Sequence, residues 1–345
     1  MEVKQQLEAS VIIATYNRSA GLARALRSLN ELDYPRDQWE IIVVDSSSND
    51  DTKHAAEAAR NSTGLNVKYV KEERLSFTVA RHTGAAAAES DILLYIDDDV
   101  TVEPGWMRAV VECFRSDPNV GMVGGPVRPI FEVQPPEWVL KMDGIWLSLY
   151  DLGSETQEAG AVGPNLCVRK SVLNKVGGFP ADAIGVEANG TPGTIKKICI
   201  GPGDGGLCDK VRAAGFKVIY VPAAVAYHHI PPIRVTKSWW HSRLAEEGRS
   251  NAITHQQEHH FGSIKLCIKA LRSLIRIGEM AVLWLIAPLR GRPAKKYIFW
   301  MSYYFSRMRN EFALARHPDL ADRLWEIDLS GILPGDYKEL LKHIP

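Results

Sequence analysis

Three consecutive carboxylates, Asp97, Asp98 and Asp99, stand at the end of the apolar stretch DILLYID, which has the composition of a buried strand. Neighbouring negative charges repel one another, so a cation is expected to neutralise them. If the backbone stays extended, alternation sends Asp97 and Asp99 to the same side. A divalent ion with oxygen ligands, Mg²⁺ or Mn²⁺, that bridges to a diphosphate fits this pattern. A solvated acidic turn is the alternative.

Another acid, Asp204, lies in the glycine-rich stretch GPGDGG. These letters also fit the G-x-G-x-x-G pattern of dinucleotide-binding proteins, since they follow an apolar stretch and precede a helical one. That pattern needs an acid about 20 residues later to meet the ribose, and the chain reads VPAAVAY there. We therefore do not expect a dinucleotide site at GPGDGG.

Strands and helices are expected to alternate through the N-terminal part of the chain. Apolar strands are predicted in VIIATYN, WEIIVVD, LNVKYV and DILLYID, with helical segments over residues 18–32, 52–60 and 78–88. This order is typical of an α/β protein with a parallel, doubly wound sheet flanked by helices. Ligands of such sheets bind outside the carboxyl ends of the strands, where Thr15, Asp45 and the three consecutive carboxylates would lie.

After the fourth predicted strand the chain becomes less regular. Residues 121–163 are rich in Gly, Pro and Trp, as expected of loops and short strands around a cleft. Order returns with a predicted helix in LCDKVRAAG and a predicted strand in KVIYVP, and Pro231-Pro232 is expected to close the domain. We predict a first domain over residues 1–232 and a C-terminal helical region over residues 233–345.

The composition excludes several classes of protein. The 345 residues are 46% hydrophobic and 24% charged, as in an ordinary folded chain, and 41 Lys and Arg balance 41 Asp and Glu, so no overall charge would attract nucleic acid. Five cysteines without a C-x-x-C pair favour neither a disulfide framework nor a zinc ribbon. The N-terminal residues lack the apolar core of a secretory signal, so a cytosolic location is expected.

The C-terminal region is locally basic. Residues 261–310 contain ten Lys and Arg against one acid, Glu279, together with the apolar runs LIRIGEMAVLWLIAPL and YIFWMSYYF. Charges interrupt these runs before the roughly 20 apolar residues that a spanning helix needs. The pattern favours a helix that lies on an anionic membrane face, and a helical cap packed on the first domain is the alternative.

Five blocks resemble, in order, the signature of family 2 glycosyltransferases. They are VIIATYNR, VVDSSSNDDT, ARHTGAAAAESDILLYIDDDV, GPNLCVRKSVLNKVGGF and GDGGLCDKVRAAGFKVIYVP, and the resemblance covers about residues 10–230. It implies a GT-A fold, with a C-terminal helical extension in this chain, and inverting transfer from a nucleotide-diphosphate sugar.

The resemblance implies roles for residues on the donor side. Thr15, Tyr16 and Asn17 match the loop on the nucleoside, Asp45 matches the acid that bonds the base, and Arg81 would face the diphosphate. Asp97 and Asp98 would line the donor, and Asp99 would bind Mg²⁺ or Mn²⁺. Local explanations stay open, because Thr15 or Asp45 could cap a loop or helix, Asn17 could serve a turn and Arg81 could be an exposed helix arginine.

Further roles concern the acceptor side and the metal. The resemblance places the catalytic base at Asp204, where Gly203 replaces the usual Glu. We choose His229 rather than His228 as a second metal ligand, because alternation lets only one of them point inward. Trp239 and Trp240 could stack on an acceptor sugar, although tryptophan is more often core.

Together these features predict a metal-dependent inverting glycosyltransferase of polysaccharide biosynthesis. It would move one sugar at a time, since the Q-x-x-R-W signature of processive synthases is absent, from a donor that is favoured to be a UDP-sugar. The acceptor would be a glycan or a lipid-linked molecule, with the enzyme peripheral at the inner face of the plasma membrane. A sugar-nucleotide nucleotidyltransferase and a catalytically inactive nucleotide- or glycan-binding scaffold are the alternatives.

Overall fold

The computed structural model describes residues 7–181, 183–187, 195–199, 201–290 and 294–324, and the chain forms two compact units. The sheet unit comprises Met1–Ile130, Leu147–Pro180 and Gly203–Ile230; the helical unit comprises Phe131–Trp146, Ala181–Pro202 and Pro231–Pro345. Because the chain passes between the units more than once, the single boundary at residue 232 stays a prediction.

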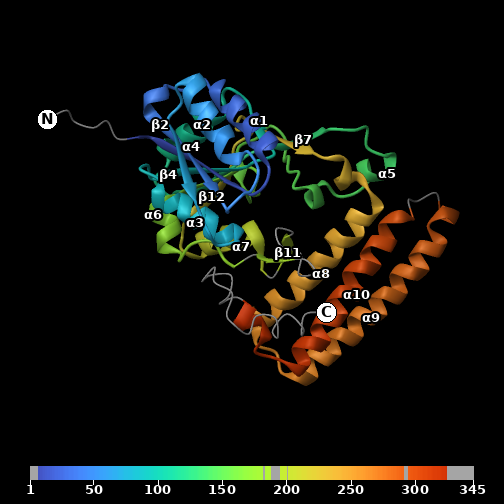
Figure 1. Ribbon diagram of the computed structural model, residues 1–345. Helices are drawn as coiled ribbons and strands as arrows, with labels where there is room; N and C mark the ends of the chain where they lie inside the picture. The colour runs from blue at the N-terminus through green and yellow to red at the C-terminus, as the bar shows by residue number, and fades with distance from the viewer. Residues whose placement is uncertain (1–6, 182, 188–194, 200, 291–293, 325–345) are drawn as a thin grey trace. The chain divides into compact units, whose positions relative to one another are not determined.

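An eight-stranded sheet with the order β3-β2-β1-β4-β9-β6-β12-β8 forms the centre of the sheet unit (Figure 1). Strands β1 to β4 are parallel to one another, and β6 is parallel to β12. Strand β9 runs antiparallel to β4 and β6, and β8 runs antiparallel to β12. The predicted α/β class with a mostly parallel, helix-flanked sheet is therefore confirmed. The strands are β1 Ala9–Thr15, β2 Trp39–Asp45, β3 Val67–Lys71, β4 Ile92–Asp97, β6 Val120–Gly124, β8 Gln157–Glu158, β9 Leu166–Arg169 and β12 Lys217–Tyr220.

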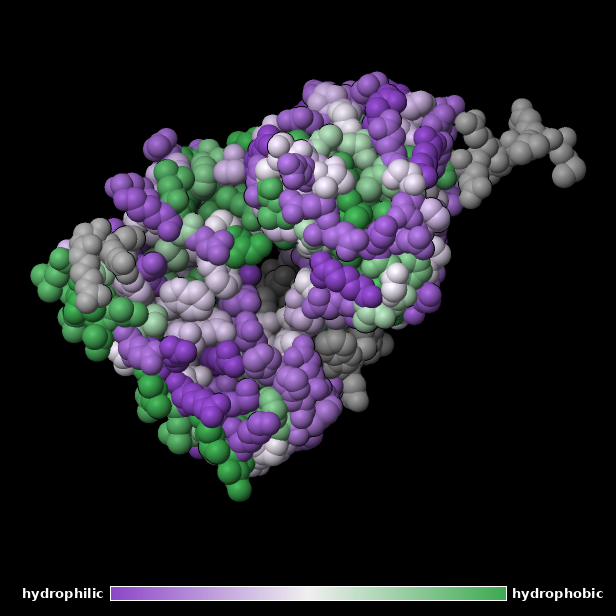
Figure 2. Space-filling model, turned by 180° about the vertical axis from the view of Figure 1, so that it is seen from behind, coloured by the Kyte–Doolittle hydropathy of each residue, from purple (hydrophilic) through white to green (hydrophobic). Residues whose placement is uncertain are grey.

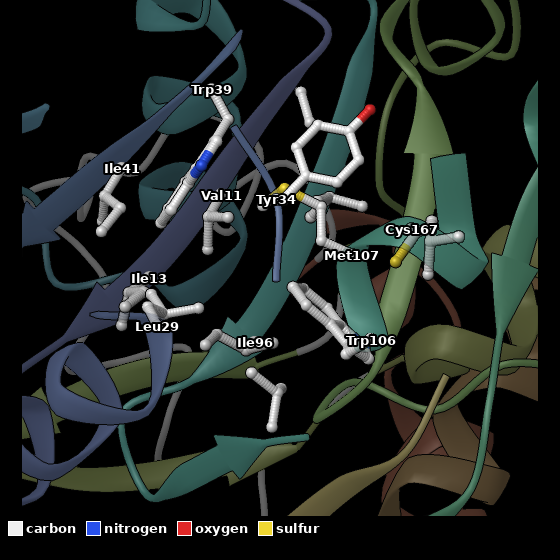
Figure 3. Packing of buried hydrophobic residues seen from close by; sticks show 14 of the residues in the cluster. Val11, Ile13, Leu29, Tyr34, Trp39, Ile41, Ile96, Trp106, Met107 and Cys167 are labelled. Carbon is white, nitrogen blue, oxygen red and sulfur yellow. The ribbon is translucent and has the colours of Figure 1, made fainter. Parts of the chain in front are cut away.

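Two apolar layers cover the faces of this sheet, because neighbouring residues of a buried strand point to opposite sides. In β1, Val11 and Ile13 join the layer formed with α1 Ser19–Asn30, α2 Thr52–Thr63 and α4 Trp106–Ser116 (Figure 3). Ile12 joins the opposite layer, formed with α3 Phe77–Ala87, α6 Lys170–Lys175 and α7 Gly203–Ala213. The inner strands β1, β2 and β4 are thus packed from both sides.

Two elements differ from the sequence-based expectation. Helix α7 begins at Gly203, which has a φ of 59°, so that Asp204 lies in its first turn instead of in a preceding loop. The strand β13 Ala226–Ile230, which carries His228 and His229, is not among the predicted strands. This strand forms a small second sheet with β5 Val100–Val102 and β7 Val127–Phe131, in the order β5-β13-β7. The carboxylates at the end of β4 and the histidines are brought together because β5 directly follows β4.

The helical unit is dominated by three long helices, α8 Lys237–His259, α9 Ser263–Ile286 and α10 Lys295–Arg316 (Figure 1). None of the helices in the described residues is long and apolar enough to cross a membrane. The unit also contains the antiparallel hairpin β10 Ala183–Glu187 and β11 Ile195–Cys199 and the short helix α5 Glu137–Leu140. Among the described residues, short 3₁₀ helices are η1 Arg36–Gln38, η2 Gly144–Leu147, η4 Pro232–Val235 and η5 Pro288–Arg290.

The contact between α3 and β1 gives a first prediction. A Cβ atom at Gly84 of α3 would lie 2.4 Å from Ile12 Cγ2, and Ile12 is completely buried. Since the stiff isoleucine cannot yield in a packed layer, Gly84→Ala should lower the free energy of unfolding by about 1–3 kcal/mol, measured by urea denaturation. Gly205→Ala in α7 is the control, because nothing lies within 4 Å of its added Cβ. Equal destabilisation by both substitutions would show that α3 does not depend on this close approach.

Candidate active site

The carboxyl ends of three neighbouring strands bring the predicted polar residues together. Thr15 of β1 is paired with Asp45 of β2, and Ala14 beside it is paired with Asp97 of β4. Asp98 and Asp99 leave the strand in a tight turn before β5. The backbone therefore does not stay extended through the three carboxylates, and strand alternation cannot decide where Asp99 points.

Asp98 and Asp99 share one arginine. Arg18 Nη1 donates to Asp98 Oδ1 at 3.1 Å and to Asp99 Oδ2 at 2.8 Å, and Thr15 Oγ1 donates to Asp98 Oδ2 at 2.8 Å. Arg18 was missed in the sequence, although one local signal points to it. It stands at the N-cap position of α1, where the helix dipole disfavours a positive charge. The nearby carboxylates explain this placement.

A second arginine, Arg81, connects two further carboxylates. Its Nη1 donates to Asp204 Oδ1 at 2.7 Å, and its Nη2 lies 3.9 Å from Asp97 Oδ1. The guanidinium is only 5% exposed and packs against the rings of Phe77 and Phe179, whose centres lie 4.1 and 5.0 Å away. The structure therefore excludes the alternative of an exposed helix arginine.

Both oxygens of Asp204 have partners. Oδ1 accepts from Arg81, and Oδ2 accepts from the backbone N–H of Gly163 at 2.7 Å. A Cβ atom at Gly163 would lie 2.7 Å from that oxygen and 2.8 Å from Arg81 Nη2, so only glycine leaves room for this approach. The carboxylate is thus held in one orientation in the first turn of α7.

Burial of these carboxylates opposes their ionisation. It raises the pKa of Asp98 to about 6, against the lowering effect of Arg18. Burial also raises the pKa of Asp97, and here Arg81 is the main opposing charge. Their remaining negative charge makes a further cation favourable at this edge of the sheet.

The two histidines of β13 have different neighbours, and His228 rather than the chosen His229 has its side chain beside Asp99. His228 is buried, and its Nε2 lies 3.3 Å from Asp99 Oδ1, whereas His229 Nε2 lies 3.1 Å from Thr101 Oγ1. The register of β13 against β5, which pairs His228 with Val100, decides this, and the sequence did not predict that pairing. His228 is therefore the histidine beside the carboxylate predicted to bind metal.

A divalent cation would have few protein ligands here. In the described residues no group of three or more His, Cys, Asp or Glu side chains is arranged to hold a metal ion. Asp99 Oδ1 and His228 Nε2 are nevertheless spaced like neighbouring ligands of a small octahedral ion, which lie about 3 Å apart. Since Arg18 bonds the other oxygen of Asp99, this pair fits an ion whose remaining ligands come from a substrate or water.

The loop predicted to hold a nucleoside is ordered by its own polar groups. Asp45 Oδ1 accepts from the Ser48 N–H at 2.8 Å, and Asp45 Oδ2 accepts from the Tyr69 hydroxyl at 2.6 Å. Asn17 has a φ of 50°, its N–H donates to Ser48 Oγ, and its Oδ1 accepts from the Asn49 N–H. The local roles left open for Asp45 and Asn17 are therefore real, whether or not these residues also contact a ligand. Tyr16 is half-buried beside them.

Trp239 and Trp240 lie in α8 of the helical unit. Trp240 is completely buried, with its ring centre 6.0 Å from both Trp138 and Phe299. Its side chain has no surface on which an acceptor sugar could stack, so its observed role is in the core. Trp239 packs edge-on against Trp240 and is half-buried, which leaves part of its ring accessible. Of the two, only Trp239 keeps its predicted acceptor contact as a hypothesis.

Residues 10–177 match the family described as Glycosyl transferase family 2. Glycosyltransferase AglE of Haloferax volcanii is 28% identical over 178 residues, which make up 50% of this chain and 55% of that protein. The chain thus spans about half the length of this relative. Glucosyl-dolichyl phosphate glucuronosyltransferase of the same organism is 22% identical over 259 residues, 72% of this chain and 77% of that protein.

A solved structure supports the fold. The mannosyltransferase PcManGT from Pyrobaculum calidifontis, in complex with GDP-Man and Mn²⁺, superposes with a TM-score of 0.52 at 18% identity. The alignment covers 97% of this chain and 83% of that one. The predicted GT-A fold is therefore confirmed, as is the resemblance to family 2 glycosyltransferases.

The loop after β3 gives a prediction that depends on pH. Glu72 is buried and accepts from Arg74 Nε at 2.7 Å and from Thr83 Oγ1 of α3 at 2.6 Å, and these bonds lower its pKa to about 2. Because the pKa of this carboxyl group is lower in the folded protein than in the unfolded chain, its ionisation stabilises the fold. This stabilisation is complete at pH values above about 4.5, the pKa of Glu in the unfolded chain, and it is lost as the pH falls towards 2. Glu72→Gln should therefore lower the free energy of unfolding by about 1–3 kcal/mol at pH 7.

Chemical denaturation of both proteins at several pH values tests this expectation. The difference between wild type and Glu72→Gln should shrink progressively from pH 4.5 to pH 2. Glu73→Gln is the matched control, since the Glu73 side chain is 85% exposed. A difference that stays constant across this range would mean that the charge of Glu72 does not stabilise the fold.

Proposed function

We propose that this chain, whose residues 10–177 belong to glycosyl transferase family 2, is a metal-dependent inverting glycosyltransferase. It would transfer one sugar from a nucleotide-diphosphate sugar to a hydroxyl group of an acceptor. One observation carries the proposal. The Asp204 carboxylate is fixed by Arg81 and by the Gly163 N–H, and the same arginine approaches Asp97 at the carboxyl end of β4. A potential proton acceptor and an acidic donor site are thereby connected through one buried cation.

Inversion requires one base and one displacement. Asp204 takes the proton of the acceptor hydroxyl while the hydroxyl oxygen bonds to the anomeric carbon. The bond from that carbon to the diphosphate breaks, and the nucleoside diphosphate leaves with the bonding electrons. The Asp204 carboxylate accepts two hydrogen bonds, from Arg81 and from the Gly163 N–H, and it keeps further lone pairs for a proton. Arg81 therefore orients the base as well as facing the donor.

The donor would lie along the ends of β1, β2 and β4. Thr15, Tyr16 and Asn17 would border the nucleoside, with Asp45 ordering the loop through Ser48 and Tyr69. Asp97 and Asp98 would border the ribose and diphosphate. Asp99 would hold Mg²⁺ or Mn²⁺ together with His228, in place of the His229 of our sequence-based choice. When bound, such an ion would neutralise charge on the departing diphosphate.

The finer identity of donor and acceptor belongs to the proposal as well. A UDP-sugar remains our prediction, although the similar PcManGT was crystallised with GDP-Man. A glycan or lipid-linked acceptor is supported by the relative whose name includes dolichyl phosphate. A place in polysaccharide biosynthesis, at the inner face of the plasma membrane, would suit such an acceptor.

Asp204→Asn tests the role of the base. An amide cannot take the hydroxyl proton, so transfer should fall by a factor of about 10²–10⁴ or more, whereas donor binding should change little. Transfer is measured as the release of nucleoside diphosphate from a panel of UDP- and GDP-sugars with candidate acceptors. Nucleotide binding is measured as the thermal shift caused by UDP and GDP. Asp209→Asn in the same helix is the control, since its side chain is 80% exposed. Unchanged transfer by Asp204→Asn would remove Asp204 from the mechanism, and wild-type nucleotide binding without any turnover would favour the inactive scaffold.

Asp99→Asn tests the metal. A ligand that binds only the folded protein stabilises it by about 2.7 kcal/mol at 100 times its Kd, so UDP or GDP with Mn²⁺ should raise the melting temperature of the wild type. Chelation, or Asp99→Asn, should remove most of this rise. Asp33→Asn is the control, because this aspartate is 74% exposed. If nucleotide raises the melting temperature equally with Mn²⁺ and with chelator, donor binding does not use a metal at Asp99.

A further inference from the structure

Helix α9 carries a second apolar face besides the one that packs inside the helical unit. Its inner face includes Leu266 and Ala270, which are buried, and Leu266 packs with Leu314 of α10. A separate row, here called the outer stripe, consists of apolar residues that are each between 46% and 80% exposed. The outer stripe is Ile264, Ile268, Leu271, Ile275, Val282 and Leu285.

The spacing of the outer stripe makes it continuous. Its residues recur at intervals of three, four or seven, so they share one side of the helix. From Ile264 to Leu285 the stripe extends for about 32 Å at the rise of an α-helix. Figure 2 shows hydrophobic side chains along the corresponding edge of the molecule. An exposed apolar row of this length indicates a contact surface, because single exposed apolar residues are ordinary but contiguous ones are not.

A basic row follows one flank of the outer stripe. Lys265, Lys269, Arg272 and Arg276 each come one residue after a member of the stripe. One residue corresponds to about 100° around the helix, so the four cations form a line parallel to the stripe. The one acid in this helix is Glu279, which pairs with Arg276. The outer stripe and the basic row are therefore complementary to a partner that has an apolar region next to negatively charged groups.

We propose that the outer stripe and the basic row of α9 bind flat on an anionic phospholipid bilayer. The apolar side chains would enter the boundary between headgroups and acyl chains, and the lysines and arginines would contact the phosphates. The helix lies along the surface, since no helix in the described part of the chain can span a membrane. This inference does not depend on the proposed catalytic activity.

A second copy of the chain is the competing occupant, and charge argues against it. An antiparallel two-fold pairing through the outer stripe would place both basic rows along the same edge of the interface. Their mutual repulsion would oppose the pairing, whereas an anionic bilayer would attract both the row and the stripe.

Flotation of the full chain with vesicles tests the proposal. Vesicles of phosphatidylcholine with 30% phosphatidylserine should bind the protein, and vesicles of phosphatidylcholine alone should bind it more weakly. Lys265→Gln with Arg272→Gln should weaken binding to the anionic vesicles by about 10- to 25-fold, and raising the salt concentration should act in the same direction. Leu271→Gln with Ile275→Gln should weaken binding by at least about tenfold.

Two controls make the result decisive. Leu140→Gln with Ile233→Gln replaces two apolar residues of the helical unit outside α9 that are 60% and 58% exposed, and it should bind like the wild type. Far-UV circular dichroism establishes that each variant is folded. Equal binding by the stripe variant and this control, or no binding to anionic vesicles at all, would overturn the proposal. Analytical ultracentrifugation that detects a dimer lost in the stripe variant, without vesicle binding, would identify a second copy as the occupant.

Discussion

The candidate site depends on the neutralisation of buried and half-buried carboxylates by two arginines, of which Arg81 is buried and Arg18 is partly exposed. Asp98 and Asp99 share Arg18, and Asp97 and Asp204 share Arg81. Each arginine thus serves two acids, so among these six residues the negative charges are in excess. A diphosphate would add to this excess, because it is itself an anion. A divalent cation beside Asp99 would offset the negative charge of such a ligand.

The position of Asp204 depends on residues that make no contact with it. Asn165 is completely buried and donates through Nδ2 to the carbonyl oxygens of Ala224 and Pro126, while its Oδ1 accepts from Trp106 Nε1. Its backbone N–H closes a turn onto Val162, and the N–H of Gly163 inside that turn reaches Asp204. The sheet unit therefore fixes the carboxylate from two directions, since α7 carries it and the anchored turn orients it. A rigid support of this kind is what a positioned base requires.

The sequence could predict the features of the fold and the site that depend on contacts between residues close together in the chain. Alternation of apolar strands and helices predicted the sheet and the edge at which Thr15, Asp45 and Asp97 meet, because these patterns repeat within a few residues. The partner of Asp204 could not be found in this way, since Arg81 lies far from it in the chain and only the tertiary fold brings them together. The same is true of His228, whose direction is set by the pairing of β13 with β5. Arg18 was within reach, because a cation at a helix N-terminus already conflicts with local electrostatics.

Charge is also unevenly distributed along the chain, and this bears on how the protein would meet a membrane. The whole chain is neutral, but residues 261–310 carry ten cationic side chains against one acid, so the remainder has a net charge of −9. An anionic surface attracts the first part and repels the second. The attraction falls off within about 10 Å at 0.1 M salt, so it acts only where the basic residues come close to the surface. A basic row beside an apolar stripe would therefore select one orientation of approach, which a neutral chain with evenly mixed charges could not do.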